Sequence, residues 1–402
     1  MRQNDEMGAI AALSEAGSLQ GAQPTHPLVQ YLGEWGEISA FDPNLIITLY
    51  RGWSENTRRA FLSDIRLWEN WCRRHHMNPV TATAEDVVHF LQEASAPHLL
   101  DRRGQPKRTE AGQRIKNPHY RAPSTLTRRL THIAMAYRML GLESPTKSDL
   151  VRLEMKALRR ERGVKKKQAR ALRYKGDVTD LVHDVPEGLC IANITAHLQK
   201  DWSGKTDVIS LRDRALLLTA YDVGARRSEL VAIEVEHIEL NKDSSGTLYI
   251  PHSKTDQEGE GAHAYLSPRS MRAIAAWQKA AKITAGPLFR RIDVYSDGSA
   301  RAIHKSPMHA DSVTRAYRRL IMKAWEAGQL PEFSESEIKR AVKTVTSHSV
   351  RVGVAHDNFA AGEDLPAIMQ AYRWRDAKTV LRYGEKLAPV SGAAKRMAAR
   401  IG

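Results

Sequence analysis

Side chains of the kinds that handle phosphate esters recur in four short segments in the second half of this chain. In chain order, they are Arg226 and Glu229 in GARRSEL, Lys254 in PHSKTD, His348 and Arg351 in SHSVR, and Trp374 and Tyr383 in RWRDAKTVLRYGE. A single His-x-x-Arg pair is a weak signal in a chain with 16 histidines and 61 lysines and arginines. The whole set, however, suits attack on a phosphodiester by a phenol.

Each kind of side chain in the set meets a requirement of that reaction. The transition state gathers negative charge on the non-bridging phosphate oxygens, and a planar guanidinium hydrogen-bonds two of them at once. Fixed donors of this kind contribute roughly 3–4 kcal/mol each in comparable sites. A tyrosine hydroxyl has an ordinary pKa of about 10, so it needs a positive environment or a base to become a nucleophile. A lysine can supply the proton that the leaving oxygen requires.

Other common kinds of active site lack their signatures in this sequence. His348 has no cysteine or carboxylate partners at the spacing of metal ligands. No glycine-rich phosphate-binding loop and no Gly-x-Ser-x-Gly turn occurs. We therefore expect neither a metal ion nor another cofactor.

Positive charge is concentrated in the middle of the chain. Residues 102–175 hold 22 Lys and Arg against 5 Asp and Glu, a net charge of +17, whereas the whole chain carries +15. The alternative is a solvated linker, but much of this segment has a helical pattern. The distribution therefore favours nucleic acid as the partner.

The segment from residue 54 to residue 76 predicts an amphipathic helix. Its apolar residues recur at helical spacing and predict a face that packs in a core. Arg59, Arg66 and Arg73 recur every seven residues on another face, which can lie along a phosphate backbone. For any one of these arginines, the alternative is a merely solvated face.

The pattern divides the chain into two mainly helical domains. Residues 1–40 are small and polar and predict a flexible extension. Residues 41–164 predict a helical domain, with a capping box at Thr83 and Asp86 and an irregular basic insert at 97–123. Residues 165–176 predict a linker. Residues 177–402 predict mostly helix, with TLYIPHSK and GAHAYLS forming a small antiparallel hairpin and helices continuing from about Ser270.

The sequence contains no signal for a membrane or for secretion. No segment approaches the ~20 consecutive apolar residues of a membrane span, and the N-terminus has no secretion signal. Cys72 and Cys190 both lie in apolar surroundings and predict reduced core residues. We expect a cytoplasmic protein that is nucleoid-associated when it binds DNA.

The ordered motifs resemble those of the tyrosine site-specific recombinases, the phage integrase family. The family pattern is an Arg with a Glu three residues on, a hairpin Lys, a His-x-x-Arg, a His or Trp, and a Tyr nine residues later. HSVRVGVAHDNFAAGEDLPAIMQA and SENTRRAFLSDIRLWENWC are also similar to the family, so the likeness covers about residues 45–400. It implies a mainly α fold: a helical core-binding domain that clamps DNA, then a mostly α catalytic domain with a small antiparallel β-sheet.

The resemblance also implies roles for the motif residues. Tyr383 attacks the scissile phosphate and forms a 3′-phosphotyrosyl link, while Arg226 and Arg351 clamp that phosphate. Lys254 is the general acid for the leaving 5′-oxygen. His348 acts as a base or a hydrogen-bond donor near the nucleophile.

Further implied features concern orientation, DNA contacts and assembly. Glu229 orients the active-site groups, and Trp374 offers its indole N–H to the phosphate. Arg315 in SVTRAYRRLIMKAW reaches a base in the major groove or, as an alternative, a phosphate. The amphipathic tail PVSGAAKRMAARIG docks into a neighbouring copy, so that a homotetramer holds two double-stranded DNA sites. Strands then exchange through a Holliday junction.

Three residues compete with members of the set. Arg227 adjoins Arg226, but the Gly-x-Arg-x-Ser-Glu-Leu spacing favours Arg226. Lys305 is a weaker rival to Lys254. Tyr372 is the nearest competing phenol, but it breaks the family spacing.

Two other functions are compatible with parts of the pattern. A type IB topoisomerase or a hairpin telomere resolvase uses the same chemistry without exchanging partners between duplexes. The docking tail argues for exchange. A DNA-binding regulator without catalysis would gain nothing from a placed tyrosine.

Overall fold

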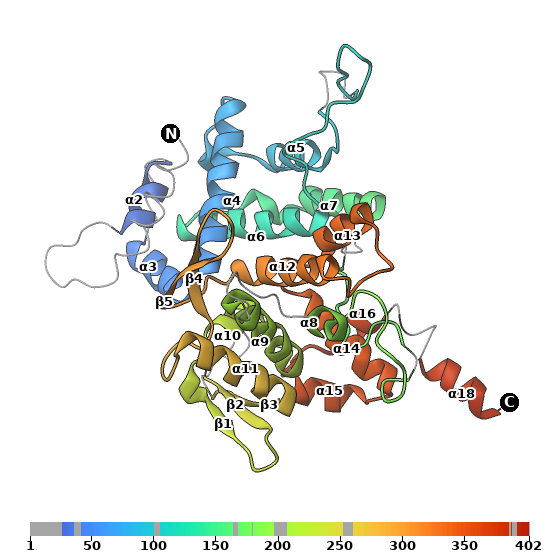
Figure 1. Cartoon of the computed structure of the whole chain (residues 1–402). Coiled ribbons are helices and arrows are strands. Elements are labelled where there is room, and N and C mark those ends of the chain that lie inside the picture. Colours follow the sequence, from blue (N-terminus) through green and yellow to red (C-terminus); the bar gives the residue numbers. More distant parts are fainter. Residues whose placement is uncertain are drawn as a thin grey trace, which may run out of the picture. The chain divides into compact units, whose positions relative to one another are not determined.

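The computed structural model describes residues 26–35, 42–99, 105–163, 168–178, 180–196, 207–251, 260–385, 387 and 392–401 (Figure 1). The chain divides into two compact units, residues 1–166 and 167–402. Lys254 lies outside the described residues. None of the described helices is both long enough and apolar enough to cross a membrane.

The first unit is built from helices around an aromatic core. Its helices are α2 (Pro27–Gly33), α3 (Pro43–Arg51), α4 (Glu55–Arg74), α5 (Ala84–Ser95), α6 (Pro123–Met139) and α7 (Asp149–Arg162). Ser54 caps α4, and the capping box of Thr83 and Asp86 is present at the start of α5, as the sequence predicts. Trp68 of α4 is fully buried and stacks on Trp71 with ring centroids 5.4 Å apart.

The prediction of a flexible extension over residues 1–40 is wrong for residues 27–35. They include α2, whose first turn contains Pro27, and His26 caps it by accepting a hydrogen bond from a backbone N–H. Leu28 and Leu32 are buried in the core of the first unit together with Trp35. Residues 1–40 are polar on average, and this average composition does not indicate the short apolar helix within them.

The basic insert has little regular structure among its described residues, but backbone pairing holds its two ends together. The amide of Leu99 donates to the carbonyl of Ile115, and the amide of Asn117 donates to that of Pro97. Buried Asn117 also donates its side-chain amide to the carbonyls of Glu93 and Ala96. The insert is therefore anchored to the end of α5.

The second unit is mostly helical, and its described residues form two small antiparallel sheets. Its helices are α8 (Ile191–Ala196), α9 (Val208–Val223), α10 (Arg227–Val231), α11 (Pro268–Ala281), α12 (Ser312–Glu326), α13 (Glu335–Thr344), α14 (Ser349–Ala361), α15 (Leu365–Ala371), α16 (Ala377–Gly384) and α18 (Ala393–Ile401). The strand order of the larger sheet is β1 (Ile238–Leu240), β2 (Gly246–Ile250) and β3 (Ala262–Leu266). The mainly α fold class with a small antiparallel sheet is confirmed.

A second hairpin, β4 (Arg290–Val294) and β5 (Ala300–Pro307), was not predicted. It interrupts the run of helices expected from about Ser270. The turn signal is present in the sequence, because Asp297 and Gly298 form an Asp-Gly pair and Gly298 has φ +83°. Charged residues in both strands hide the alternation that would otherwise mark a half-buried strand.

The predicted linker, residues 165–176, includes residues that pack in the core of the second unit. Residues 168–176 belong to the core of the second unit, where Leu172 is fully buried and its amide donates to the carbonyl of Ser349. A side chain at Gly353 would meet the Leu172 carbonyl oxygen at 2.0 Å, so this close crossing requires glycine. Basic composition suggested a solvated linker, whereas Arg173 is buried in an ion pair.

That ion pair joins the segment to α14. Asp357 of α14 accepts hydrogen bonds from Arg173 Nε at 2.6 Å, from the amide of Tyr174 at 2.8 Å and from the hydroxyl of Tyr221 at 2.6 Å. Both charged side chains are almost completely buried.

Asp357→Asn should lower the free energy of unfolding by about 3–5 kcal/mol, because it removes the buried counter-charge of Arg173 and leaves only the fully exposed carboxylate of Asp177, 3.3 Å from that guanidinium. Tyr221→Phe removes only one of the three donors and should cost about 1 kcal/mol. Urea unfolding of the full-length protein measures both. Equal losses for the two variants would show that the charge of Asp357 is unimportant.

Candidate active site and a basic pocket

Arg351 is held in the interior by the ends of two helices. It lies in the first turn of α14, is 3% exposed, and donates a hydrogen bond to the carbonyl of Gly224. Gly224 ends α9 in the left-handed region with φ +57°, and a side chain there would meet the ring of Tyr372 at 2.8 Å. Glycine thus allows the turn that presents its carbonyl to Arg351.

Arg226 follows this turn and is oriented by Glu229. Glu229 Oε1 lies 2.6 Å from a guanidinium nitrogen of Arg226, and Oε2 accepts from the Arg226 amide at 3.0 Å. The Glu229 carboxylate is buried, while the Arg226 side chain remains 26% exposed. Arg226 is therefore fixed at its base and still accessible to a ligand.

Tyr383 meets His348 across the gap between α16 and α14. The Tyr383 hydroxyl lies 2.5 Å from His348 Nε2, and the two rings meet edge to face. Asp376 caps α16, and buried Val380 anchors the helix one turn before Tyr383. The structure thus brings together a phenol and an imidazole that are 35 residues apart in the sequence.

Burial and the two guanidinium charges shift the protonation of this cluster. Loss of hydration, then the charges of Arg351 and Arg226, lower the pKa of His348 to about 4. Burial raises the pKa of Tyr383, while the same two arginines oppose that rise. Burial, and next the charge of Arg226, lower the pKa of Arg351 to about 10. At neutral pH, His348 is therefore a neutral imidazole that can accept a proton.

Trp374 places an unpaired donor in the same region. Its indole is 5% exposed, and its buried Nε1 has no hydrogen-bond partner among the residues that the structure describes. The Arg351 guanidinium lies 5.2 Å from the centre of the Trp374 ring, and the Tyr383 ring lies 6.0 Å from it. A buried N–H without a partner is costly, so this donor is suited to an oxyanion that binds between these groups.

The rival residues are engaged elsewhere. Arg227 is half exposed and pairs with Asp311. The hydroxyl of Tyr372 receives a hydrogen bond from the amide of Asn358 at 3.2 Å, not from His348. Lys305 is exposed on β5.

Sequence reasoning missed two residues of this site. Arg373 lies 4.0 Å from Glu229, and one of its buried guanidinium nitrogens has no hydrogen-bond partner within the described ranges. His356 Nε2 lies 2.7 Å from the carbonyl oxygen of Tyr383, in the last turn of α16, where helix carbonyls lack partners. The sequence does contain a signal for His356: it lies eight residues after His348, a spacing that places the two histidines on neighbouring faces of one helix.

The lowered pKa of His348 makes stability depend on pH. The unfolded imidazole binds a proton near its ordinary pKa of 6.5, whereas the folded one does so only near 4. The unfolded state therefore holds more protons between these values, and stability should fall as the pH is lowered from 6.5 to 4. Relative to His348→Gln, the wild type should lose thermal stability over this window. Parallel melting-temperature curves would contradict the assignment.

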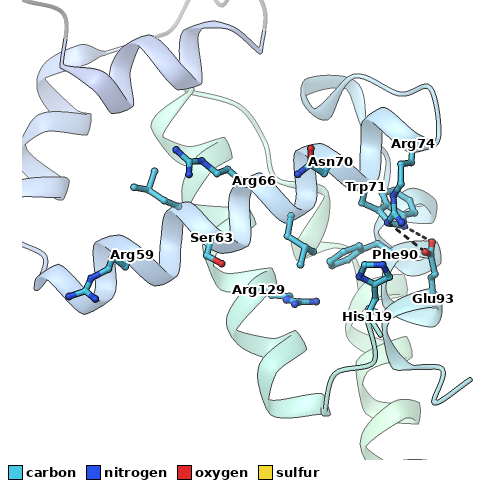
Figure 2. Close-up of a pocket in the computed structure, with 13 residues that line it drawn as sticks. Arg59, Ser63, Arg66, Asn70, Trp71, Arg74, Phe90, Glu93, His119 and Arg129 are labelled. Atoms are coloured by element: carbon cyan, nitrogen blue, oxygen red, sulfur yellow. Dashed lines mark hydrogen bonds and ion pairs between the residues drawn. The ribbon is translucent and has the colours of Figure 1, made fainter. Parts of the chain in front are cut away.

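The first unit has its own basic pocket, of about 530 Å³, between α4, α5 and α6 (Figure 2). Arg59 and Arg66 line it together with Arg74, whereas Arg73 does not. Arg59 and Arg73 each pair with a glutamate one turn earlier on α4, at 2.7 and 2.6 Å. Of the three arginines predicted to lie on one face of α4, only two line this pocket.

Arg129 of α6 is the most buried cation of this pocket. Its side chain points toward Phe90 (Figure 2), and its buried Nε has no hydrogen-bond partner in the part of the chain that the structure describes. Asp64 lies 3.7 Å away but is already bound by Arg128 at 2.9 Å and by His132 at 2.8 Å. The pocket therefore offers cationic donors above an apolar floor.

Arg315 lies exposed on α12. Its guanidinium donates to the hydroxyl of Ser312 at 2.8 Å. The neighbouring arginines serve the fold, because Arg318 donates to the carbonyl of Val345 and Arg319 pairs with buried Asp213. Of the three, Arg315 is the one available to a ligand.

Two further expectations from the sequence concern the lack of a metal site and the burial of both cysteines. Within the described ranges, no group of three or more His, Cys, Asp or Glu side chains is arranged to hold a metal ion. Cys72 and Cys190 are free and buried, as the sequence predicts.

Comparison with known proteins places these features in context. The sequence profile of the phage integrase family matches residues 193–388. The chain is 25% identical over 354 residues to Recombinase cre from Escherichia phage P1, which covers 86% of this chain and 89% of that protein. It is 24% identical over 346 residues to an integrase/recombinase xerD homolog from Selenomonas ruminantium, covering 83% and 82%. Among solved structures, the Tn1549 transposon integrase in complex with transposon right end DNA has a TM-score of 0.47 at 12% identity, covering 82% and 89%.

Proposed function

The chain belongs to the phage integrase family of tyrosine recombinases, and on this premise we propose that it is a site-specific DNA recombinase with Tyr383 as its nucleophile. The observation that carries the proposal is the contact of the Tyr383 hydroxyl with neutral His348 beside two guanidinium groups. That environment suits a phenol that must lose its proton while it attacks an anionic ester.

Cleavage follows from these positions. The Tyr383 oxygen attacks the scissile phosphorus, and its proton passes to His348 Nε2. Arg226 and Arg351 stabilise the charge on the non-bridging oxygens, and the unpaired N–H of Trp374 supplies a further donor. The bond from phosphorus to the 5′-oxygen breaks. By resemblance, Lys254 gives that oxygen its proton, which leaves a 3′-phosphotyrosyl ester and a free 5′-hydroxyl.

Rejoining reverses these steps. The 5′-hydroxyl of a second duplex attacks the phosphotyrosyl ester and gives its proton to Lys254, while the bond from phosphorus to the Tyr383 oxygen breaks and His348 returns the proton to Tyr383. The energy of the ester bond is retained throughout, so strand joining consumes no nucleotide. Two rounds of exchange between paired sites pass through a Holliday junction, held by four copies of the chain. The amphipathic helix α18, with Met397 and Ile401 exposed, supports docking between copies.

DNA contacts are assigned to both units. In the first unit, Arg59 and Arg66 line the basic pocket and are suited to phosphates, and Arg73 faces solvent beside Glu69. In the second, exposed Arg315 on α12 is suited to a guanine edge or a phosphate. The basic insert at 97–123 adds phosphate contacts or touches a neighbouring copy of the chain.

The test first identifies the target site. The Tyr383→Phe variant is used to select, from a pool of random DNA duplexes, the sequences that it binds. A nicked duplex carrying that site should then trap the wild type as a covalent adduct on a denaturing gel. Two plasmids with the site should recombine, which a topoisomerase would not achieve. A covalent adduct without recombination between plasmids would support a topoisomerase or a telomere resolvase. DNA binding without an adduct would support a DNA-binding regulator that lacks catalysis.

A further inference from the structure

Three arginines line a small pocket in the second unit that is separate from the candidate active site. The pocket has a volume of about 240 Å³ and lies where α9 runs beside α11 (Figure 1). Its lining residues are Leu211, Arg214, Arg269, Arg272, Ala273 and Ala276. The walls thus combine guanidinium groups with aliphatic side chains and include no carboxylate.

None of the three arginines makes an ion pair or a side-chain hydrogen bond with any residue that the structure describes. The Nε atoms of Arg214 and Arg269 are both buried, and neither has a hydrogen-bond partner in the described part of the chain. Asp222, on the same helix as Arg214, is occupied by Ser267 and Ser270, whose hydroxyls donate to it.

This arrangement is unfavourable without a ligand. Burial and the charge of Arg272 lower the pKa of Arg214, although Tyr174 opposes them. Arg269 lies in the first turn of α11, where the positive end of the helix dipole disfavours a cation. Buried polar groups normally have partners. A solvated face accounts for exposed Arg272 but leaves the two buried Nε–H groups unexplained.

One of the arginines is also held in place. The Arg269 guanidinium lies 4.0 Å from the centre of the Tyr174 ring, within cation–π range. The amide of Tyr174 is in turn bound to buried Asp357. Arg269 is therefore pre-organised, which reduces the entropic cost of binding a ligand.

We propose that this pocket binds a phosphate group through Arg214, Arg269 and Arg272. The three guanidinium groups can only donate hydrogen bonds, so they favour a ligand whose oxygens only accept hydrogen bonds. The planar fork of arginine matches the spacing of phosphate oxygens. The small volume suits a single phosphate or a pyrophosphate, supplied free in solution or by a DNA backbone.

The first measurement uses the full-length protein without DNA, so that its outcome does not depend on the proposed recombinase function. Calorimetric titration with pyrophosphate at constant ionic strength should show a site in the wild type. Arg214→Gln and Arg272→Gln should each weaken binding by about tenfold or more. The matched control is Lys279→Gln, which removes one exposed positive charge from the same helix α11 and should leave the affinity nearly unchanged.

A second measurement distinguishes the source of the phosphate. If DNA supplies it, Arg272→Gln should reduce the slope of log affinity against log salt by about 0.9 on a long duplex. If free phosphate is the ligand, that slope stays unchanged while pyrophosphate binding is lost. Both outcomes support the site. It is overturned if neither measurement responds to the arginine variants, or if Lys279→Gln weakens pyrophosphate binding as much as they do. Circular dichroism and thermal melting confirm that each variant is folded.

Discussion

Tyr383→Phe should abolish the covalent protein–DNA adduct and leave DNA binding intact. The substitution removes only the oxygen that forms the ester, while the ring still fills its largely buried position between Trp374 and His348. Loss of a nucleophile from a catalytic unit lowers the rate by as much as about 10⁶-fold, which places the adduct below detection. Quenched single-turnover cleavage of the nicked substrate measures the adduct, and gel shift measures binding.

The matched control is Tyr372→Phe, which removes a hydroxyl that faces Asn358. We expect it to retain adduct formation. An adduct that persists in Tyr383→Phe and disappears in Tyr372→Phe would transfer the role of nucleophile to Tyr372. Equal loss in both variants, with binding unchanged, would indicate a structural effect of these neighbouring aromatic residues and would contradict the assignment.

Arg351→Lys should lower the rate of adduct formation by about 10²–10³-fold at saturating protein, the effect of removing one fixed donor from a developing oxyanion. Lysine keeps the positive charge but loses the planar fork that binds two oxygens. It also loses the geometry by which Arg351 donates to the Gly224 carbonyl and lies over the Trp374 ring. The rate constant of a single turnover isolates this step from DNA binding.

Arg227→Lys provides the comparison, since Arg227 pairs with Asp311 and is half exposed. Its rate should change by less than about fivefold, because an exposed ion pair contributes at most about 1 kcal/mol. A large loss in Arg227→Lys with little change in Arg351→Lys would reverse the assignment. Thermal melting of both variants separates a catalytic effect from a loss of folded protein.

Local signals in the sequence predicted much of the fold. The capping box of Thr83 and Asp86 and the apolar periodicity after Ser54 each depend on residues within one or two helical turns. The β2–β3 pair follows from two β-prone runs with a polar stretch between them. By contrast, α2 was missed because seven residues are too few to stand out in a polar segment.

The sequence proposes which residues form the candidate site, and that membership stays a prediction, whereas the geometry of the site has no signal in the sequence. Spacing separated Arg226 from Arg227, but no local rule pairs the Arg351 guanidinium with the Gly224 carbonyl, 127 residues away. The basic stretch that ends at Lys175 was interpreted as a linker because charge usually marks solvated chain. Burial of Arg173 depends on Asp357, which lies 184 residues further on. Such partners become neighbours only through tertiary packing.

Helix α14 and its N-terminal cap contact Tyr383 at two points, the phenolic hydroxyl and the backbone carbonyl. His348 contacts the Tyr383 hydroxyl, and His356, two turns on, contacts the Tyr383 carbonyl. Phe359 of the same helix packs against Gly384, where an added Cβ would lie 2.5 Å from its ring. The position of the Tyr383 hydroxyl therefore depends on how α16 packs against α14. A small shift of α16 along α14 would therefore separate the Tyr383 hydroxyl from His348 without moving Arg226 and Arg351, the two arginines proposed to bind phosphate.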